Sequence, residues 1–205
     1  MAKVKLTKTE LKTQSDALKR FQRFLPMLQL KKQQLQAEIA VIDARIEDVN
    51  AREMQANAAL SGWVALFAAD TAPLREVLTF EGVTTDSSNI AGVTIPVYKG
   101  IKTKTQEIDL FATPAWFDDA LKAMQQIWEL KAEHDVLDEQ RRLIIEELNT
   151  TSQRVNLFEK VKIPECRENI RVIKIAIGDE QTASVTRGKI AKGRSAKNET
   201  EEAAA

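Results

Sequence analysis

Apolar residues recur along most of this chain at alternating intervals of three and four residues. The repeat covers residues 11–67 and 116–158, and it resumes over residues 163–177 after an interruption near Pro164. A mean spacing of about 3.5 residues keeps one apolar stripe facing a partner helix over many turns, whereas a helix on a globular surface drifts out of register. The pattern therefore predicts two long helices that pack along a coiled-coil seam.

The two predicted helices are similar in length, as an intramolecular antiparallel pair requires. The fold class that we expect is mainly α, with a long antiparallel two-helix coiled coil formed by the N- and C-terminal arms and a short central β-hairpin. The seam residues that we predict are Leu18, Leu25, Leu35, Ile39, Ile42, Ile46, Val49, Leu137, Ile144, Leu148, Val155, Ile170 and Ile173.

Helix-breaking and capping residues set the predicted boundaries. Thr113 and Pro114 form a typical helix start, because a hydroxyl cap precedes a proline at the first helical position. Gly178 suits the C-cap position of the second arm. The predicted parts are an N-terminal arm (1–69), a central segment with a short helix and the hairpin (70–112), a C-terminal arm (113–178) and a polar tail that is basic and then acidic (179–205).

The central segment departs from the helical period. Residues 74–78 suit a short helical piece, and residues 79–85 and 90–98 are rich in Val, Thr, Ile and Phe. These two runs predict a β-hairpin whose turn is the polar stretch 86–89, with Pro96 indicating an edge strand. Since an isolated two-stranded hairpin is marginally stable in water, we expect it to pack on the helices or on another chain.

Charge is distributed unevenly although the net charge is zero. Residues 1–35 carry nine Lys or Arg against two acids and residues 160–197 carry ten against four, whereas residues 38–81 carry eight acids against three bases and residues 107–147 carry eleven against four. If the two arms fold back on each other, basic segments meet at one end of the pair and acidic segments at the other.

Residues typical of catalysis or metal binding are scarce in the sequence. His134 is the only histidine and falls on the seam, Cys166 is the only cysteine, and neither a phosphate-binding loop nor a zinc-ligand cluster is present. A single cysteine excludes an internal disulfide and suits a reducing compartment. The basic stretch 187–197 lacks interleaved aromatic residues, which disfavours nucleic-acid binding. We also find no candidate membrane span or signal peptide, and we expect a cytoplasmic protein without a cofactor.

Four local strings carry a family resemblance. They are LPMLQLKK at residues 25–32, NIAGVTIPV at 89–97, TPAWFDDAL at 113–121 and RVNLFEKVKIPE at 154–165. In this order on a helix–hairpin–helix chain, the set resembles the D subunit family of V/A-type rotary ATPases, in particular its bacterial branch. The resemblance extends from about residue 3 to about residue 194. Ala91 stands where the family more often has a larger apolar residue, and the tail beyond Lys197 departs from the family pattern.

The resemblance implies a non-catalytic rotor shaft that couples ATP synthesis or hydrolysis to proton or Na⁺ transport. The implied partners are the nucleotide-binding A and B subunits of the catalytic hexamer, the small F subunit of the central stalk and the C/d socket subunit above the membrane rotor. The implied location is cytoplasmic and peripheral to the inner membrane. A prefoldin-like coiled-coil chaperone subunit and a generic coiled-coil scaffold are the alternatives from other classes.

Two sets of partner contacts follow as hypotheses. The first set lies at the basic end and should enter the hexamer: Lys12, Lys19, Arg20, Arg23, Arg167, Arg171 and Lys174. The second set lies in the hairpin and should contact the F subunit or, alternatively, this chain's own coil: Ile90, Val93, Ile95, Val97 and Tyr98.

Overall fold

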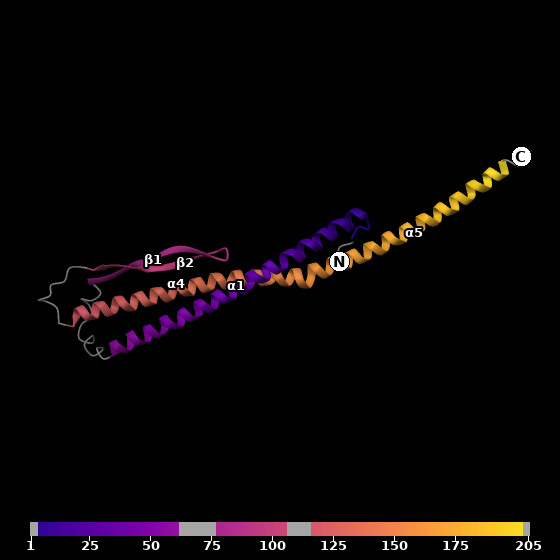
Figure 1. The fold of residues 1–205 in the computed structure, drawn as a ribbon. Helices are drawn as coiled ribbons and strands as arrows, with labels where there is room; N and C mark the ends of the chain where they lie inside the picture. The colour runs from indigo at the N-terminus through magenta and orange to yellow at the C-terminus, as the bar shows by residue number, and fades with distance from the viewer. Residues whose placement is uncertain (1–3, 62–76, 106–115, 203–205) are drawn as a thin grey trace. The chain divides into compact units, whose positions relative to one another are not determined.

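The computed structural model describes residues 4–61, 77–105 and 116–202, which form long helices and one two-stranded sheet (Figure 1). The elements are α1 (Lys8–Ser61), β1 (Leu78–Ile90), β2 (Val93–Thr105), α4 (Phe117–Asn156), the π-helix η1 (Leu157–Lys162) and α5 (Ile163–Glu202). The predicted fold class, an antiparallel helical pair with a central β-hairpin, is confirmed. The chain divides into two compact units, unit 1 with residues 1–30 and 152–205 and unit 2 with residues 31–151.

Unit 2 is built on a heptad core. The helical residues of this buried cluster are spaced by seven residues on each helix, and they are Leu35, Ile42 and Val49 on α1 and Leu130, Leu137 and Ile144 on α4. Three ion pairs join the helices beside this core: Lys31–Glu147 (2.6 Å), Asp43–Arg141 (2.6 Å) and Arg52–Glu133 (3.6 Å). The residue numbers rise along α1 while those of the partners fall along α4, so the two helices are antiparallel. Because the side chains of all three pairs remain at least partly exposed, each pair adds little stability compared with the buried side chains.

The structure places the predicted seam residues as follows. Seven are buried, namely Leu35, Ile42, Val49, Leu137, Ile144, Val155 and Ile173. The other six are partly buried, namely Leu18, Leu25, Ile39, Ile46, Leu148 and Ile170.

Thr151 follows Ile144 in the heptad register of α4 and is buried, with 1% of its surface exposed. Its Oγ1 atom is buried without a hydrogen-bond partner among the described residues. A buried hydroxyl that has lost water and gained no partner destabilises the fold. We expect Thr151→Val, which keeps the side-chain shape, to raise the free energy of unfolding by about 1 kcal/mol, measured by urea denaturation.

The neighbouring Thr150 provides the control for this prediction. Its Oγ1 donates a hydrogen bond to the carbonyl oxygen of Glu146 at 3.1 Å. Thr150→Val removes a satisfied hydroxyl and should give no gain in stability. Equal stabilisation by both variants would contradict the explanation based on the unpaired hydroxyl of Thr151.

The hairpin turn lies at Ala91 and Gly92, so the predicted turn at residues 86–89 is wrong. Those residues belong to β1 and pair with residues 94–97 of β2. Ala91 and Gly92 both have positive φ (50° and 83°), and a two-residue loop of this kind matches the right-handed twist of the flanking strands. The side chain of Asn89 supports the turn by accepting a hydrogen bond from the backbone N–H of Gly92 at 3.0 Å. Residues 86–89 are polar because they lie in an exposed part of β1, and this polarity led to the wrong prediction of a turn there.

Unit 1 contains the interruption that the sequence predicts near Pro164. Proline has no N–H, and in an α-helix its ring clashes with the carbonyl four residues earlier. The chain widens into the π-helix η1 just before it, and the N–H of Ile163 donates to the carbonyl oxygen of Phe158, five residues back. The ring of Phe158 lies 5.0 Å from that of Phe21 on α1. The chain therefore remains helical while the proline is accommodated.

Helix α5 continues through Gly178 to Glu202, so the predicted helix end at Gly178 is wrong. An interior glycine costs only about 1 kcal/mol relative to alanine, and no proline follows it. The Thr182 hydroxyl donates to the carbonyl oxygen of Gly178 at 3.0 Å. The predicted helix start at Thr113 and Pro114 and nearly all of the predicted short helix at residues 74–78 lie outside the described residues.

Candidate partner-binding surfaces

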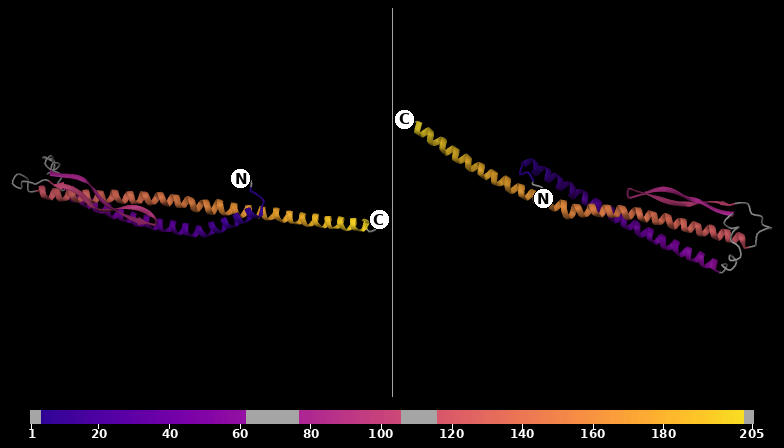
Figure 2. Two further views of the ribbon diagram at one scale, coloured as in Figure 1. Left: turned by 90° about the horizontal axis from the view of Figure 1, so that it is seen from above. Right: turned by 180° about the vertical axis from the view of Figure 1, so that it is seen from behind.

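The tip of the hairpin packs on the coil of its own chain. Ile95 is 3% exposed and belongs to the buried cluster of the coil, against which Ile90 and Val93 also pack. The Nε2 atom of the buried Gln140 on α4 donates to the carbonyl oxygen of Pro96 at 2.5 Å. The two views of Figure 2 show the hairpin lying alongside α4. Three of the five predicted hairpin contacts therefore face the protein itself.

A second small core holds the base of the hairpin. Leu78 at the start of β1 is buried with Phe117 and Leu121 at the start of α4. The ring of Phe80 meets that of Trp128 edge-on, with centroids 5.8 Å apart. Since the hairpin is held at both its base and its tip, it presents a fixed surface rather than a free arm.

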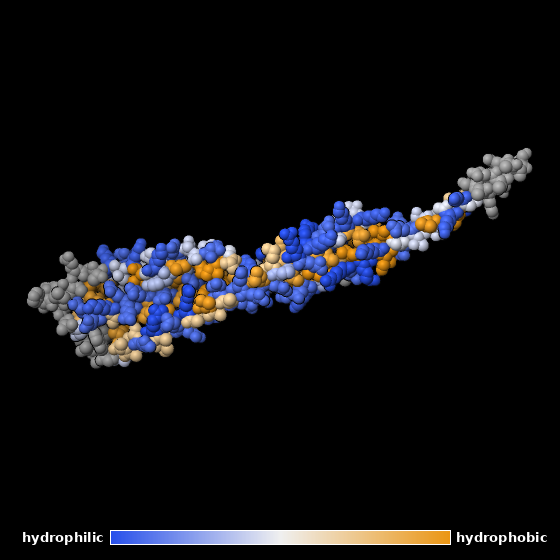
Figure 3. All heavy atoms as spheres, viewed as in Figure 1, coloured by the Kyte–Doolittle hydropathy of each residue, from blue (hydrophilic) through white to orange (hydrophobic). Residues whose placement is uncertain are grey.

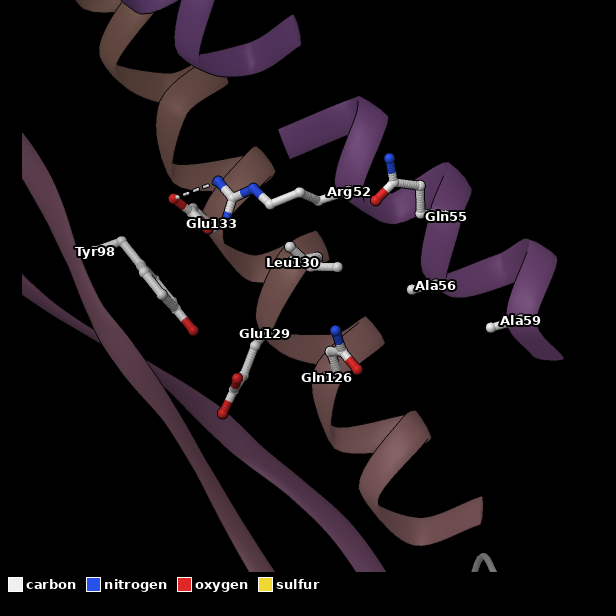
Figure 4. Close-up of a pocket in the computed structure, with 9 residues that line it drawn as sticks. All are labelled: Arg52, Gln55, Ala56, Ala59, Tyr98, Gln126, Glu129, Leu130 and Glu133. Carbon is white, nitrogen blue, oxygen red and sulfur yellow. Dashed lines mark ion pairs between the residues drawn. The ribbon is translucent and has the colours of Figure 1, made fainter. Parts of the chain in front are cut away.

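A groove opens between the two helices and β2, on the side of the hairpin that carries Tyr98 (Figure 4). Its volume is about 460 Å³. We call it the hairpin groove, and it is lined by Arg52, Gln55, Ala56, Ala59, Tyr98, Gln126, Glu129, Leu130 and Glu133. The two remaining predicted hairpin contacts, Val97 and Tyr98, are partly exposed, and only Tyr98 lines the groove.

The hairpin groove is electrically negative. Glu129 and Glu133 stand one helical turn apart on α4. Burial raises the pKa of the Tyr98 phenol above its ordinary value, and the charges of Glu129 and Glu133 raise it further. Arg52, the only cation among the described lining residues, lies 3.0 Å from Asp48 and 3.6 Å from Glu133.

The seven cations predicted for the basic end are all exposed, and we use the name basic face of unit 1 for them: Lys12, Lys19, Arg20, Arg23, Arg167, Arg171 and Lys174. Arg171 is held by its own helix, with Nε and Nη2 donating to Glu168 at 2.9 and 2.6 Å. This hydrogen bonding lowers the pKa of Glu168 and raises that of Arg171. The other six cations form no ion pair with a described residue, and they are therefore available to an acidic partner.

Cys166 and His134 are the only cysteine and the only histidine of the sequence. Cys166 is buried, and burial raises the pKa of its thiol above the ordinary value, which lowers its reactivity. His134 lies 3.6 Å from Asp138 on the same helix. No cluster of potential metal ligands occurs among the described residues. Within the same ranges, no helix is long and apolar enough to cross a membrane.

The described residues define a class of protein: long helices packed along a heptad seam, with a two-stranded hairpin held against them. Comparison with known proteins gives the family. The model of the family described as the D subunit of ATP synthase matches residues 10–193. This chain belongs to that family.

Relatives of the chain are similar over nearly their whole length. The V-type ATP synthase D subunit of Borreliella burgdorferi is 43% identical over 192 residues, which cover 94% of this chain and 95% of the relative. The protein of the same name from Chlamydia pneumoniae is 34% identical over 92% of this chain and 91% of the relative. The resemblance to the bacterial branch of the D subunit family is confirmed.

Proposed function

We propose that this protein is the central-stalk subunit of a V-type rotary ATPase or ATP synthase. It couples ATP synthesis or hydrolysis in the complex to the transport of protons or Na⁺ across a membrane. The observation that carries this proposal is the similarity to a V-type ATP synthase D subunit over 94% of the chain. The family match disfavours the prefoldin-like chaperone and the generic scaffold.

The role that we propose is mechanical rather than catalytic. Two helices packed along a shared seam resist bending and twisting better than one helix, so torque applied to one part of the coil reaches another. An asymmetric shaft surface then favours a different conformation in each surrounding subunit, which couples shaft angle to nucleotide state. The seam in the described coil supplies the packing that such a shaft needs.

We assign the basic face of unit 1 to the ring of nucleotide-binding A and B subunits. Six exposed cations without ion pairs among the described residues suit successive weak contacts with ring carboxylates. Exposed pairs contribute about 0.2–1 kcal/mol each, so none holds the shaft at one angle. Large apolar side chains are also exposed in unit 1, including Phe24, Met27 and Leu30 on α1 and Leu157 and Val161 on η1. Figure 3 shows apolar surface between polar side chains on the visible face of the helices.

We assign the hairpin side of unit 2 to the small F subunit of the stalk, and further contacts to the C/d socket subunit. The protein would then be peripheral to the inner membrane on its cytoplasmic side. The partly exposed Val97 and Tyr98 are the hairpin residues that we propose for the F subunit. Ile90, Val93 and Ile95 would instead hold the hairpin in position from beneath.

Affinity purification tests the proposal. We expect a tagged chain, recovered from native cells in mild salt, to bring down nucleotide-binding ATPase subunits together with ATP turnover, identified by mass spectrometry and an ATPase assay. The tag alone provides the control. Recovery of unfolded clients or a chaperonin, without ATPase subunits, would contradict the stalk function and favour the prefoldin-like alternative.

A further inference from the structure

The hairpin groove combines groups from three elements that are distant in sequence. Arg52 and Ala56 come from α1, Glu129 and Glu133 from α4, and Tyr98 from β2 (Figure 4). Its volume of about 460 Å³ is ample for a single side chain with water. No element of unit 2 among the described residues fills it. The described elements of unit 2 therefore leave room in the groove for a further side chain.

The charges of the groove favour a cation. Arg52 is shared between Asp48 and Glu133, and its distance to Glu133, 3.6 Å, exceeds that of a good hydrogen bond. Glu129 is exposed and forms no ion pair with any described residue. Counting the lining residues alone, two carboxylates face one cation, so a visiting cation neutralises the remaining charge.

The other lining groups distinguish between the two cationic side chains. Tyr98 offers an aromatic face at one wall, and planar guanidinium groups stack on such faces. The carboxylate of Glu129 and the side-chain carbonyl oxygens of Gln55 and Gln126 add separated acceptors. The guanidinium of arginine has five N–H donors in a fixed planar arrangement, so it can donate hydrogen bonds to several separated acceptors at once, which the compact ammonium of lysine does less well.

We infer that the hairpin groove binds an arginine side chain of a partner protein, with Glu129 as its carboxylate partner and Tyr98 as its stacking wall. This inference rests on the proposed function, because it requires that the chain work within a complex. It adds to that function a specific polar contact on the hairpin side of unit 2.

The only tyrosine of the chain provides a probe inside the groove. Labelling this chain alone with 3-fluorotyrosine places a single ¹⁹F nucleus at Tyr98, and the labelled full chain is then assembled with unlabelled partner subunits. A guanidinium seated against the ring should shift the ¹⁹F resonance of Tyr98 on assembly, and its positive charge opposes the effect of Glu129 and Glu133 on the Tyr98 pKa. An assembled complex with the ¹⁹F shift and titration of the free chain would overturn the inference.

Two charge-neutralising substitutions on α4 test the carboxylate. We expect Glu129→Gln to weaken capture of the hairpin-side partner by about tenfold, since one partner of a charge pair is lost. Asp135→Asn makes the same change of charge at an exposed residue that does not line the groove, and it should bind as the unsubstituted chain does. Equal binding by both variants would overturn the inference.

The outcomes separate the two proposals. A chain that assembles with ATPase subunits while its groove stays unoccupied contradicts only the arginine site. A chain that captures no ATPase subunits contradicts the stalk function itself. Coupling of a partner lysine to Glu129 by a carbodiimide would overturn the choice of arginine.

Discussion

Ile42→Asp should destabilise the coil by about 3–5 kcal/mol, because it buries a carboxylate without a cationic partner. Ile42 is 2% exposed and lies at the centre of the heptad core, between Leu35 and Val49. Domains of ordinary size are stable by only about 5–15 kcal/mol. The variant should therefore lose much of its helicity at moderate temperature, as measured by far-ultraviolet circular dichroism during thermal and urea unfolding.

Val41 supplies a matched control for this substitution. It is adjacent in sequence, is also β-branched, and is 47% exposed. Val41→Asp introduces the same charge into the same helix, but the carboxylate remains in water, so the melting transition should change little. Ile144→Asp, at a fully buried position on α4, should reproduce the effect of Ile42→Asp. Similar melting of the Ile42 and Val41 variants would refute the assignment of the seam.

The heptad core was predictable because its signal is local. The spacing of Leu35, Ile42 and Val49 is visible in sequence and requires no knowledge of other elements. The same repeat places the polar Thr151 one heptad after Ile144 on α4. That its buried hydroxyl has no hydrogen-bond partner among the described residues depends on the packing around it and is visible only in the structure. A period of seven thus predicts which face of a helix is buried, but it does not predict how each polar group on that face is satisfied.

The wrong predictions of a turn at residues 86–89 and of a helix end at Gly178 have a common physical cause. Asp86 and its polar neighbours suit a turn by composition, yet in β1 they face solvent, and Asp86 pairs across the strands with Lys99 at 2.8 Å. Hydrogen bonding from Lys99 lowers the pKa of Asp86. Likewise Gly178 is of the residue type preferred at helix C-termini, but it lies within the exposed part of helix α5. In both places local composition permits two conformations, and the surrounding backbone pairing decides between them.

The candidate surfaces were predictable only in part. The basic face follows from charge counting, because exposed lysines and arginines at helical spacing need no partner to be recognised. The hairpin groove depends on the placement of β2 against α4, which Gln140 and Ile95 fix. The spacing of Glu129 and Glu133 is visible in the sequence, but no local pattern brings Tyr98 to the same place. Tertiary contacts between distant elements therefore limit what sequence alone reveals of this site.

Neutralising the basic face of unit 1 should weaken binding to the ring of nucleotide-binding subunits about a hundredfold. The variant replaces six cations with glutamine: Lys12, Lys19, Arg20, Arg23, Arg167 and Lys174. If each exposed contact contributes about 0.5 kcal/mol, together they contribute about 3 kcal/mol, which corresponds to roughly a hundredfold change in dissociation constant. Arg171 is retained because Glu168 already neutralises it. Binding of the full chain to the purified ring gives the measurement.

A sixfold variant in unit 2 controls for the loss of positive charge as such. It replaces six exposed cations with glutamine: Arg45, Lys99, Lys102, Lys104, Lys122 and Lys131. This variant should bind the ring as the unsubstituted chain does, because its substitutions lie outside the basic face. Equal weakening by the two variants would show that net charge, rather than the basic face, determines affinity.

If many weak contacts share the binding free energy, two further results are expected from the same binding measurement. Any single substitution, such as Arg20→Gln, should change the dissociation constant by no more than about fivefold, because an exposed pair contributes at most about 1 kcal/mol. Raising the salt concentration should weaken binding of the unsubstituted chain far more than that of the sixfold variant of the basic face, since salt screens exposed charges. A single substitution that abolished binding would identify one dominant ion pair, which would favour one shaft angle and oppose rotation. Many weak contacts at exposed positions instead allow the basic face to meet each ring subunit in turn with nearly equal free energy.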